Sequence, residues 1–356
     1  MTDLLPLGIH FGLDEDTYHA DPGLGSTGLK AVAQNPIDFQ FDRLNPEERK
    51  ETPALLWGSA FHARVLEGSY QFERKYQVLP AKEEFPDALV TMDDLRGWLI
   101  EKEVKPSGKK KEDLIRQVLA IDPEVDIWDE IIRFAEARAI NAKASLISRK
   151  VNHQIDLAVN WMQQNRILKP IMEDGAFING APEVSIIYED RGVRLKARFD
   201  YLYPGMVVDL KSYRPWTSRQ ETKNVMKAIR DMRYDLQAAA YLRAYDFARD
   251  MFHAGELQVH GLPPADGWVE TMFNVPSDKV QWIWVMLKAS GAPISTAVEF
   301  KKELLVFETS SREIENAIDI YRAYTERFGA DKDWMPDSEV FVLADEDFPP
   351  NWGVYA

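Results

Sequence analysis

Three side chains that stand close together in the sequence could carry metal-assisted chemistry: Asp200, Asp209 and Lys211. The residues between them predict two β-strands joined by a tight Pro204-Gly205 turn. Residues two apart in a strand lie roughly 6.6 Å apart and point to the same face, so Asp209 and Lys211 share a face and the hairpin can bring Asp200 beside them. Two carboxylates that hold Mg²⁺ beside an ammonium group suit the hydrolysis of a phosphodiester.

Four other residues could complete this site. His62 falls on a helix predicted over 53–67, and Glu183 opens the first of the predicted strands. Gln237 and Tyr241 are four apart, so they share one face of a later helix, from which they could support the site or contact a phosphate.

The residue types suggest a division of roles. Asp200 and Asp209 supply the hard oxygen ligands that Mg²⁺ prefers, and the Leu210 carbonyl could add another. His62 could be a nitrogen ligand or could position a water. Lys211 could orient or activate the attacking water and offset negative charge in the transition state. A role for Lys211 as a base stays open, because neighbouring cations can lower the pKa of a lysine.

Each of these patterns is ordinary when it stands alone. An Asp-x-Lys pair is usually a surface strand pair, a single histidine is more often hydrogen-bonded on a helix face, and Gln-x-x-x-Tyr is common in helices. Their combination, in the order helix, strand, strand, strand, helix, is much more specific.

In that order the chain resembles the PDDEXK nuclease superfamily, in its RecB-like branch, and more closely the RecE-type exonuclease (exodeoxyribonuclease VIII). The resemblance runs over about residues 14–330, with an interruption near 90–120. It implies an α/β fold with a restriction-endonuclease-like core, in which a central mixed sheet is flanked by helices. It also implies that Asp200, Asp209 and His62 lie at the metal, with Glu183 in support, and that Lys211 is catalytic. The motifs that carry it are Gly58-Ser-Ala-Phe-His62, Glu183, Asp200, Asp209-Leu-Lys211 and Gln237-Ala-Ala-Ala-Tyr241.

The activity that the resemblance implies is a Mg²⁺-dependent exodeoxyribonuclease, with Mn²⁺ as a substitute, acting on the ends of linear double-stranded DNA. RecE-type enzymes degrade one strand from its 5′ end, form ring-like homo-oligomers and serve phage or prophage recombination, where a single-strand annealing recombinase is the expected partner. Two alternatives remain: a structure-specific endonuclease on the same scaffold, and a non-catalytic DNA-binding recombination scaffold.

Composition excludes several other classes of protein. The 356 residues are 45% hydrophobic, which is enough for a substantial core, and they contain no cysteine. Disulfides, thiolate zinc sites and the cysteine-held iron–sulfur clusters of some RecB-like relatives are therefore excluded. Residues 1–22 lack the pattern of a signal peptide and no long apolar run predicts a membrane span, so a cytoplasmic location is expected. The resemblance implies that this is the cytoplasm of a bacterium or phage-infected cell.

The net charge of −15 is unlike that of a general nucleic-acid binder, so positive charge must be gathered locally. Residues 211–233 hold seven basic residues against two acidic ones, and Arg214 in this run is a candidate DNA contact. The alternative is a solvated helix face.

Residues 90–120 predict a helix–turn–helix insert that resembles a SAP-type DNA-binding module. The nuclease domain would then comprise residues 1–89 and 121–356. Lys109, Lys110 and Lys111 in the turn could contact phosphate. The alternative is a small helical decoration with a solvated basic turn.

Periodicity predicts the remaining elements. Helices are expected over 126–168, 223–252, 277–290 and 310–328, strands over 181–188, 193–202, 206–210, 268–276 and 303–309, and an acidic, proline-rich tail over 345–355.

Overall fold

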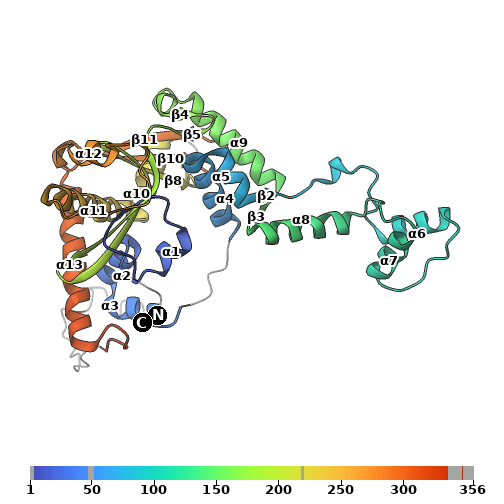
Figure 1. Cartoon of the computed structure of the whole chain (residues 1–356), viewed down its shortest axis with the longest axis horizontal. Helices are drawn as coiled ribbons and strands as arrows, with labels where there is room; N and C mark the ends of the chain where they lie inside the picture. The colour runs from blue at the N-terminus through green and yellow to red at the C-terminus, as the bar shows by residue number, and fades with distance from the viewer. Residues whose placement is uncertain (1–3, 47–51, 218–219, 336–346, 348–356) are drawn as a thin grey trace, which may run out of the picture.

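The computed structural model describes residues 4–46, 52–217, 220–335 and residue 347; the predicted tail over 345–355 therefore lies, apart from Asp347, outside them. Within these residues one seven-stranded sheet forms the centre of an α/β fold, in the order β11-β10-β8-β7-β6-β1-β9. The predicted class, a mixed sheet flanked by helices, is confirmed (Figure 1). The strands are β1 Gly8–His10, β6 Ala181–Asp190, β7 Val193–Tyr203, β8 Met206–Tyr213, β9 Val259–His260, β10 Gln281–Lys288 and β11 Ser295–Phe300.

The sheet is mixed because two of its pairs are parallel. β6, β7 and β8 form an antiparallel meander at its centre, as the sequence predicts. β10 runs parallel to β8, with Trp284 opposite Asp209, and β9 runs parallel to β1. A parallel pair needs a long crossover, and the chain between β8 and β10 supplies it with three helices: α10 Glu221–Asp231, α11 Tyr234–Ala254 and α12 Trp268–Phe273.

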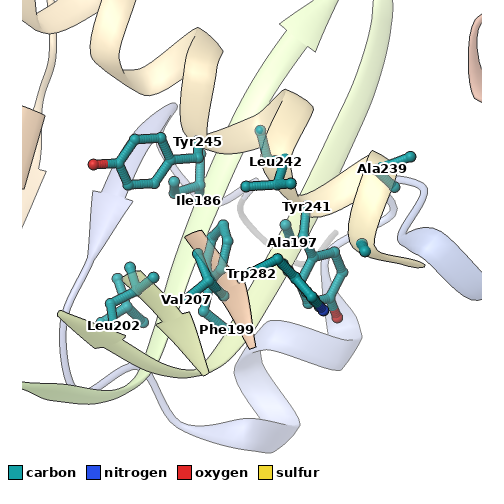
Figure 2. Close-up of a cluster of buried hydrophobic side chains, with 14 of the residues drawn as sticks. Ile186, Ala197, Phe199, Leu202, Val207, Ala239, Tyr241, Leu242, Tyr245 and Trp282 are labelled. Carbon is teal, nitrogen blue, oxygen red and sulfur yellow. The ribbon is translucent and has the colours of Figure 1, made fainter. Parts of the chain in front are cut away.

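Helices cover both faces of the sheet. On one face the core combines sheet residues with α2 Ser26–Gln34, α11 and α13 Leu305–Phe328. On the other it combines them with α4 Pro53–His62, the π-helix Ala63–Glu67 and α9 Arg149–Gln164. Figure 2 shows Ala239, Tyr241 and Leu242 of α11 above Phe199 and Val207. The run Ala238–Ala240 presents small side chains, so this helix can approach the strands closely.

The single helix predicted over 223–252 is two helices. α10 ends at Asp231 and α11 begins at Tyr234, because Arg233 adopts a left-handed conformation with φ 50°. Ion pairs from Arg233 to Asp235 (3.1 Å) and Glu313 (2.8 Å) hold this corner. Such a conformation costs about 1 kcal/mol or more for a non-glycine residue, and the sequence carries no glycine or proline to mark it.

Three element predictions in the last third of the chain are wrong. Residues 277–290 form a short 3₁₀ turn and β10, whereas 268–276 contain α12 and 303–309 contain the start of α13. β10 is buried on both faces, with Trp282, Trp284 and Met286 on one side and Val285 and Leu287 on the other. A strand buried on both faces is a continuous apolar run, which periodicity cannot distinguish from a buried helix.

The region predicted as helical over 126–168 is interrupted. α8 Trp128–Ala142 ends at Lys143, which is left-handed with φ 53°, and the strand β3 Ser145–Ile147 separates it from α9. Ser148 starts α9 by accepting a hydrogen bond from the Val151 N–H (3.2 Å). The remaining elements are α1 Glu15–Ala20, α3 Pro36–Leu44, α5 Gly68–Lys75, β2 Tyr76–Val78, β4 Met172–Glu173 and β5 Ala176–Phe177. Nowhere in the described ranges is a helix both long and apolar enough to span a membrane.

The two helices predicted in the insert are present as α6 Met92–Glu101 and α7 Lys111–Ile121. They enclose a small apolar core of their own, which is closed by Ile127 and Leu89. Figure 1 shows α6 and α7 apart from the helices that flank the sheet, with α8 leading back toward it. The buried members of this apolar core of the insert are Leu95, Leu99, Leu114, Ile115, Val118 and Ile127. The domain boundaries at 89 and 121 stay a prediction.

We expect Leu114→Ala to unfold this hairpin locally. Leu114 is fully buried in a core of only a few residues, and Leu→Ala in such a position costs about 2–5 kcal/mol. Hydrogen exchange should accelerate over 92–121 and stay unchanged over β6–β8. Ile121→Ala, at a position 43% exposed, is the matched control. Faster exchange in the sheet as well would mean that the hairpin is not an independent folding unit.

Candidate metal-binding and active site

Two of the predicted acids, Glu183 and Asp200, lie where the regular pairing of β6 with β7 is interrupted. On β7, Phe199 and Leu202 pack on the α11 face of the sheet and Tyr201 on the α4 face, so strict alternation fails between 199 and 202. β6 has the same shift, since Ala181 and Val184 both face α11. β6 therefore carries one residue more than regular alternation needs, Glu183, and β7 likewise carries one extra residue, Asp200. The register places these two opposite each other at a point where the ladder is interrupted.

Strain at Glu183 accompanies the interruption. Glu183 has φ 52°, in the left-handed region, and it follows Pro182, which has no N–H to donate to the ladder. Its carboxylate accepts a hydrogen bond from Arg198 (2.5 Å). Burial, with a contribution from Asp200, raises the pKa of Glu183 to about 7 although Arg198 opposes the shift. Glu183 is thus positioned beside Asp200 but is already paired.

Asp209 and Lys211 lie on the face of β8 that is turned toward α11. Lys211 Nζ donates to Asp209 Oδ1 (2.8 Å), and Gln237 Nε2 donates to the same oxygen (3.2 Å). Lys211 also lies 5.4 Å from the centre of the Tyr234 ring. Asp209 is 1% exposed, and its other oxygen, Oδ2, is buried with no hydrogen-bond partner among the described residues.

Asp200 lies between His62 of α4 and Lys211 of β8. Asp200 precedes the last registered β7–β8 pair, Tyr201 with Val208, and its Oδ2 accepts a hydrogen bond from the Leu210 N–H (2.7 Å). The same oxygen lies 4.0 Å from Lys211 Nζ and 3.9 Å from Nδ1 of His62, the last residue of α4. Four of the predicted residues, from a helix and two strands, therefore converge.

Burial and neighbouring charges shift the pKa values of the ionisable side chains at this site. Burial raises the pKa of Asp209 to about 7; Asp200 adds to the shift and Lys211 opposes it. Burial alone would lower the pKa of Lys211, but Asp209 and Asp200 raise it above its ordinary value. Burial lowers the pKa of His62, against the influence of Asp200. In this arrangement Lys211 is positioned as a hydrogen-bond donor to Asp209.

The donor set fits a divalent cation. Within the described ranges no three His, Asp or Glu side chains form a ready-made metal cluster. However, Asp200 and Asp209 offer carboxylate oxygens from adjacent strands, and the orphaned Oδ2 of Asp209 is a buried acceptor that still needs a donor or a cation. Asp200, Asp209 and the Leu210 carbonyl are the groups that would hold the ion.

Of the two supporting residues on α11, Gln237 contacts Asp209 directly, whereas Tyr241 is mainly structural. Tyr241 is 9% exposed and packs edge-on against Phe199 (ring centroids 5.3 Å apart). Burial raises the pKa of Tyr241 to about 12, so it stays protonated.

The predicted basic residues are only partly free to meet a ligand. Arg230 and Lys227 both pair with Asp231. Lys111 is tied to Asp129 and to the Val90 carbonyl (2.6 Å), whereas Lys109 and Lys110 are exposed. Arg214 is exposed at the end of β8, and Arg219 in the predicted basic run lies outside the described residues.

Sequence reasoning missed Lys30. This residue of α2 is close enough to Lys211 and Asp209 for their charges to act on its ammonium group, and burial lowers its pKa. Its Nζ donates to the Met232 carbonyl (3.3 Å) in the corner between α10 and α11. No local motif marks it, since only the packing of α2 beside α11 brings it to the site.

Comparison with known proteins assigns the chain to a family. Residues 25–252 match the family described as "PDDEXK-like domain of unknown function (DUF3799)", and the match includes His62, Glu183, Asp200, Asp209 and Lys211. No curated protein matches the chain. A crystal structure of a "Putative exonuclease" from Eubacterium rectale is similar over 88% of each chain, with 13% identity and a TM-score of 0.46.

The family match supports nuclease chemistry in general, and the divalent metal ions that PDDEXK nucleases use. It spans well over half of the chain, including the three central strands and the helices on both sides of them. The chain therefore belongs to the PDDEXK-like family of domains of unknown function.

Proposed function

We propose that the protein is a divalent-metal-dependent DNA nuclease of the RecE exonuclease type that degrades linear double-stranded DNA from its ends. The observation that carries the proposal is the set formed by Asp200, Asp209 and Lys211: two carboxylates across adjacent strands, a buried acceptor oxygen without a partner, and an ammonium group 2.8 Å from one acid. Mg²⁺, for which Mn²⁺ can substitute, is the expected ion.

Each residue of the set has a defined role in this proposal. When bound, the cation supplies charge stabilisation to the phosphate oxygens. Asp200 and Asp209 hold it, and Gln237 orients Asp209 through the 3.2 Å hydrogen bond. Lys211, which is protonated, orients the attacking water and offsets the charge that develops on the phosphate. His62, 3.9 Å from Asp200, and Glu183, whose charge acts on Asp200, support this ligand.

A timed digest tests the proposal. End-labelled linear duplex and covalently closed circular DNA are incubated with Mg²⁺, with Mn²⁺ or with EDTA. We expect the linear DNA to be shortened progressively with either metal, and no cleavage in EDTA. Cutting of closed circles would favour the endonuclease alternative, and absence of cleavage on every DNA form with both metals would favour the non-catalytic scaffold.

The finer parts of the proposal come from the RecE resemblance. They are degradation from the 5′ end, a ring-like homo-oligomer, phage or prophage recombination in the cytoplasm, and a single-strand annealing recombinase as partner. Labelling the 5′ or the 3′ end separately in the same digest tests the polarity. We also propose that the exposed Lys109 and Lys110 of the α6–α7 hairpin contact phosphate.

Lys30→Met should weaken DNA binding to the same degree on every DNA sequence. An ammonium group close to Lys211 and Asp209 is placed to meet a phosphate, and loss of one phosphate contact reduces the slope of log K against log salt by about one. Fluorescence anisotropy at several salt concentrations in EDTA measures both. Lys279→Met, at a side chain 71% exposed, is the control. An unchanged slope for Lys30→Met would show that Lys30 has only a structural role.

A further inference from the structure

A pocket of about 390 Å³ opens at the ends of the parallel strands β8 and β10, on the face of the sheet that α4 and α9 cover. Ser212 in its lining follows Lys211 directly in β8, and strand alternation turns these two side chains to opposite faces of the sheet. In open α/β sheets, ligands commonly bind at the carboxyl ends of parallel strands. We call it the Trp57 pocket; its lining is Pro53, Ala54, Trp57, Lys150, Val151, Gln154, Ser212, Tyr213, Arg214 and Ala289.

Trp57 provides a rigid aromatic wall for this pocket. It lies on α4, little more than one helical turn before His62 of the proposed site. One face of the indole stacks on the fully buried Phe61, with ring centroids 5.1 Å apart and planes at 9°. The Trp57 side chain is half-buried and lines the pocket, so it is held in place without being enclosed.

The charge of the Trp57 pocket is positive. Lys150 and Arg214 are both exposed in its lining, and within the described ranges neither forms an ion pair. No acidic residue lines it. The nearby Glu221 is already paired with Lys288 (3.5 Å) and with the Tyr213 hydroxyl, so its charge is compensated. In a chain of net charge −15, the lining of this pocket is therefore locally positive.

We propose that the Trp57 pocket receives one nucleotide of the DNA strand on the α4 side of the proposed active site, where His62 of the same helix lies 3.9 Å from Asp200. The base stacks on Trp57, and its phosphate meets Arg214 and Lys150. The inference rests on the proposed function and names a subsite of it. An aromatic platform beside cations is how proteins bind single-stranded nucleic acid without reading its sequence, because every base has a π-face. Trp57 is a positioning residue in this account.

The test measures binding without cleavage. Linear duplexes carry a single 2-aminopurine at one of the terminal positions of either strand, and they are titrated with the full-length protein in EDTA. We expect one position to be quenched by wild-type protein and by Trp57→Phe, but not by Trp57→Ala. Trp57→Ala should also weaken binding about tenfold, the range for loss of one stacked base.

Two further variants guard against misfolding and non-specific effects. Arg214→Gln changes an exposed side chain, so the fold is retained, and it should reduce the salt dependence of binding by about one unit of slope while leaving the quenching in place. Trp161→Ala, on α9 at a residue 44% exposed and outside the pocket, should behave as wild type.

The subsite and the nuclease proposal fail in different ways. Equal quenching and affinity for Trp57→Ala and wild type, or no quenched position in wild type, would overturn the subsite even if the protein cuts DNA. Loss of quenching in Trp57→Phe as complete as in Trp57→Ala would also overturn it, because phenylalanine retains the aromatic face. Wild-type quenching that depends on Trp57, together with no cleavage in any metal, would leave the subsite standing and remove the nuclease.

Discussion

Replacing Lys211 with Met should lower the rate of DNA degradation by about 100- to 1,000-fold, the loss expected when one preorganised donor is removed from a transition state. Lys211 is the charged group 2.8 Å from Asp209 Oδ1 and 4.0 Å from Asp200 Oδ2, and among the described lysines and arginines it alone forms ion pairs with these acids. Asp209→Asn should lower the rate of DNA degradation by as much, because the substitution removes a ligand of the ion.

Both variants should remain folded and bind DNA ends at low salt, since phosphate contacts elsewhere dominate affinity. Methionine keeps most of the volume of the lysine stem, and without Lys211 the Asp209 carboxyl can stay protonated, because its pKa is already raised to about 7. Single-turnover digestion of end-labelled duplex measures the rate, and circular dichroism checks the fold. Lys279→Met is the control at an exposed site. Full activity in purified Lys211→Met would remove the catalytic role of this residue.

The second large effect is that of pH on metal binding. The pKa of Asp209 is raised to about 7 by burial, so below pH 7 this carboxyl is mostly protonated and must lose its proton before it can bind a cation. The apparent affinity for Mn²⁺ should therefore fall about tenfold for each pH unit below 7 and level off above it. At subsaturating metal, the rate of DNA degradation should follow the same curve.

Calorimetry separates this effect from catalysis. Mn²⁺ is titrated into the protein in buffers of different ionisation enthalpy, which reports the protons released. About one proton should leave at pH 6 and almost none at pH 8.5, and Asp209→Asn should abolish the release. The raised pKa of Glu183, also about 7, adds to it only if the ion displaces Arg198. Mn²⁺ affinity that stays constant between pH 5.5 and 8 would contradict the prediction.

The same shift affects the stability of the metal-free protein. Because the folded pKa of Asp209 lies above its ordinary value of 3.8, the folded state holds more protons than the unfolded state between about pH 4 and 7. The contribution of Asp209 therefore lowers stability as pH rises through this window and becomes constant above pH 7. A divalent cation should reverse this loss, because it binds only the ionised, folded site.

The central meander was predictable because its pattern is local. β7 alternates apolar and polar residues over 193–200, and the turn Pro204-Gly205 carries its own signal, with Gly205 at φ 79°. The positions of Asp209 and Lys211 on one face follow from the strand period alone. The two helices of the insert were predictable for the same reason, since each has a clear apolar stripe.

The errors fall where burial on both sides, or a single backbone angle, decides the structure. β10 is mistaken for a helix because Trp282, Val285 and Leu287 are all buried and leave no polar face to set the period. The break between α10 and α11 depends on Arg233, whose left-handed conformation is held by Glu313 from α13. Neither the burial of β10 on both faces nor the ion pair between Arg233 and Glu313 is visible in the local sequence.

The sequence by itself determined the α/β class and the order of acid, acid and lysine along the chain, because these depend on residue type and on short-range spacing, and through its resemblance to known nucleases it determined the PDDEXK superfamily. Only the tertiary structure decided that Glu183 and Asp200 are extra residues on paired strands, that Asp209 keeps one oxygen without a partner among the described residues, that Lys30 comes near Asp209, and that Trp57 lines a pocket at the ends of β8 and β10. The physical reason is that register, burial and electrostatic coupling are set by segments far apart in the chain, which meet only when the sheet and its two helical layers have packed.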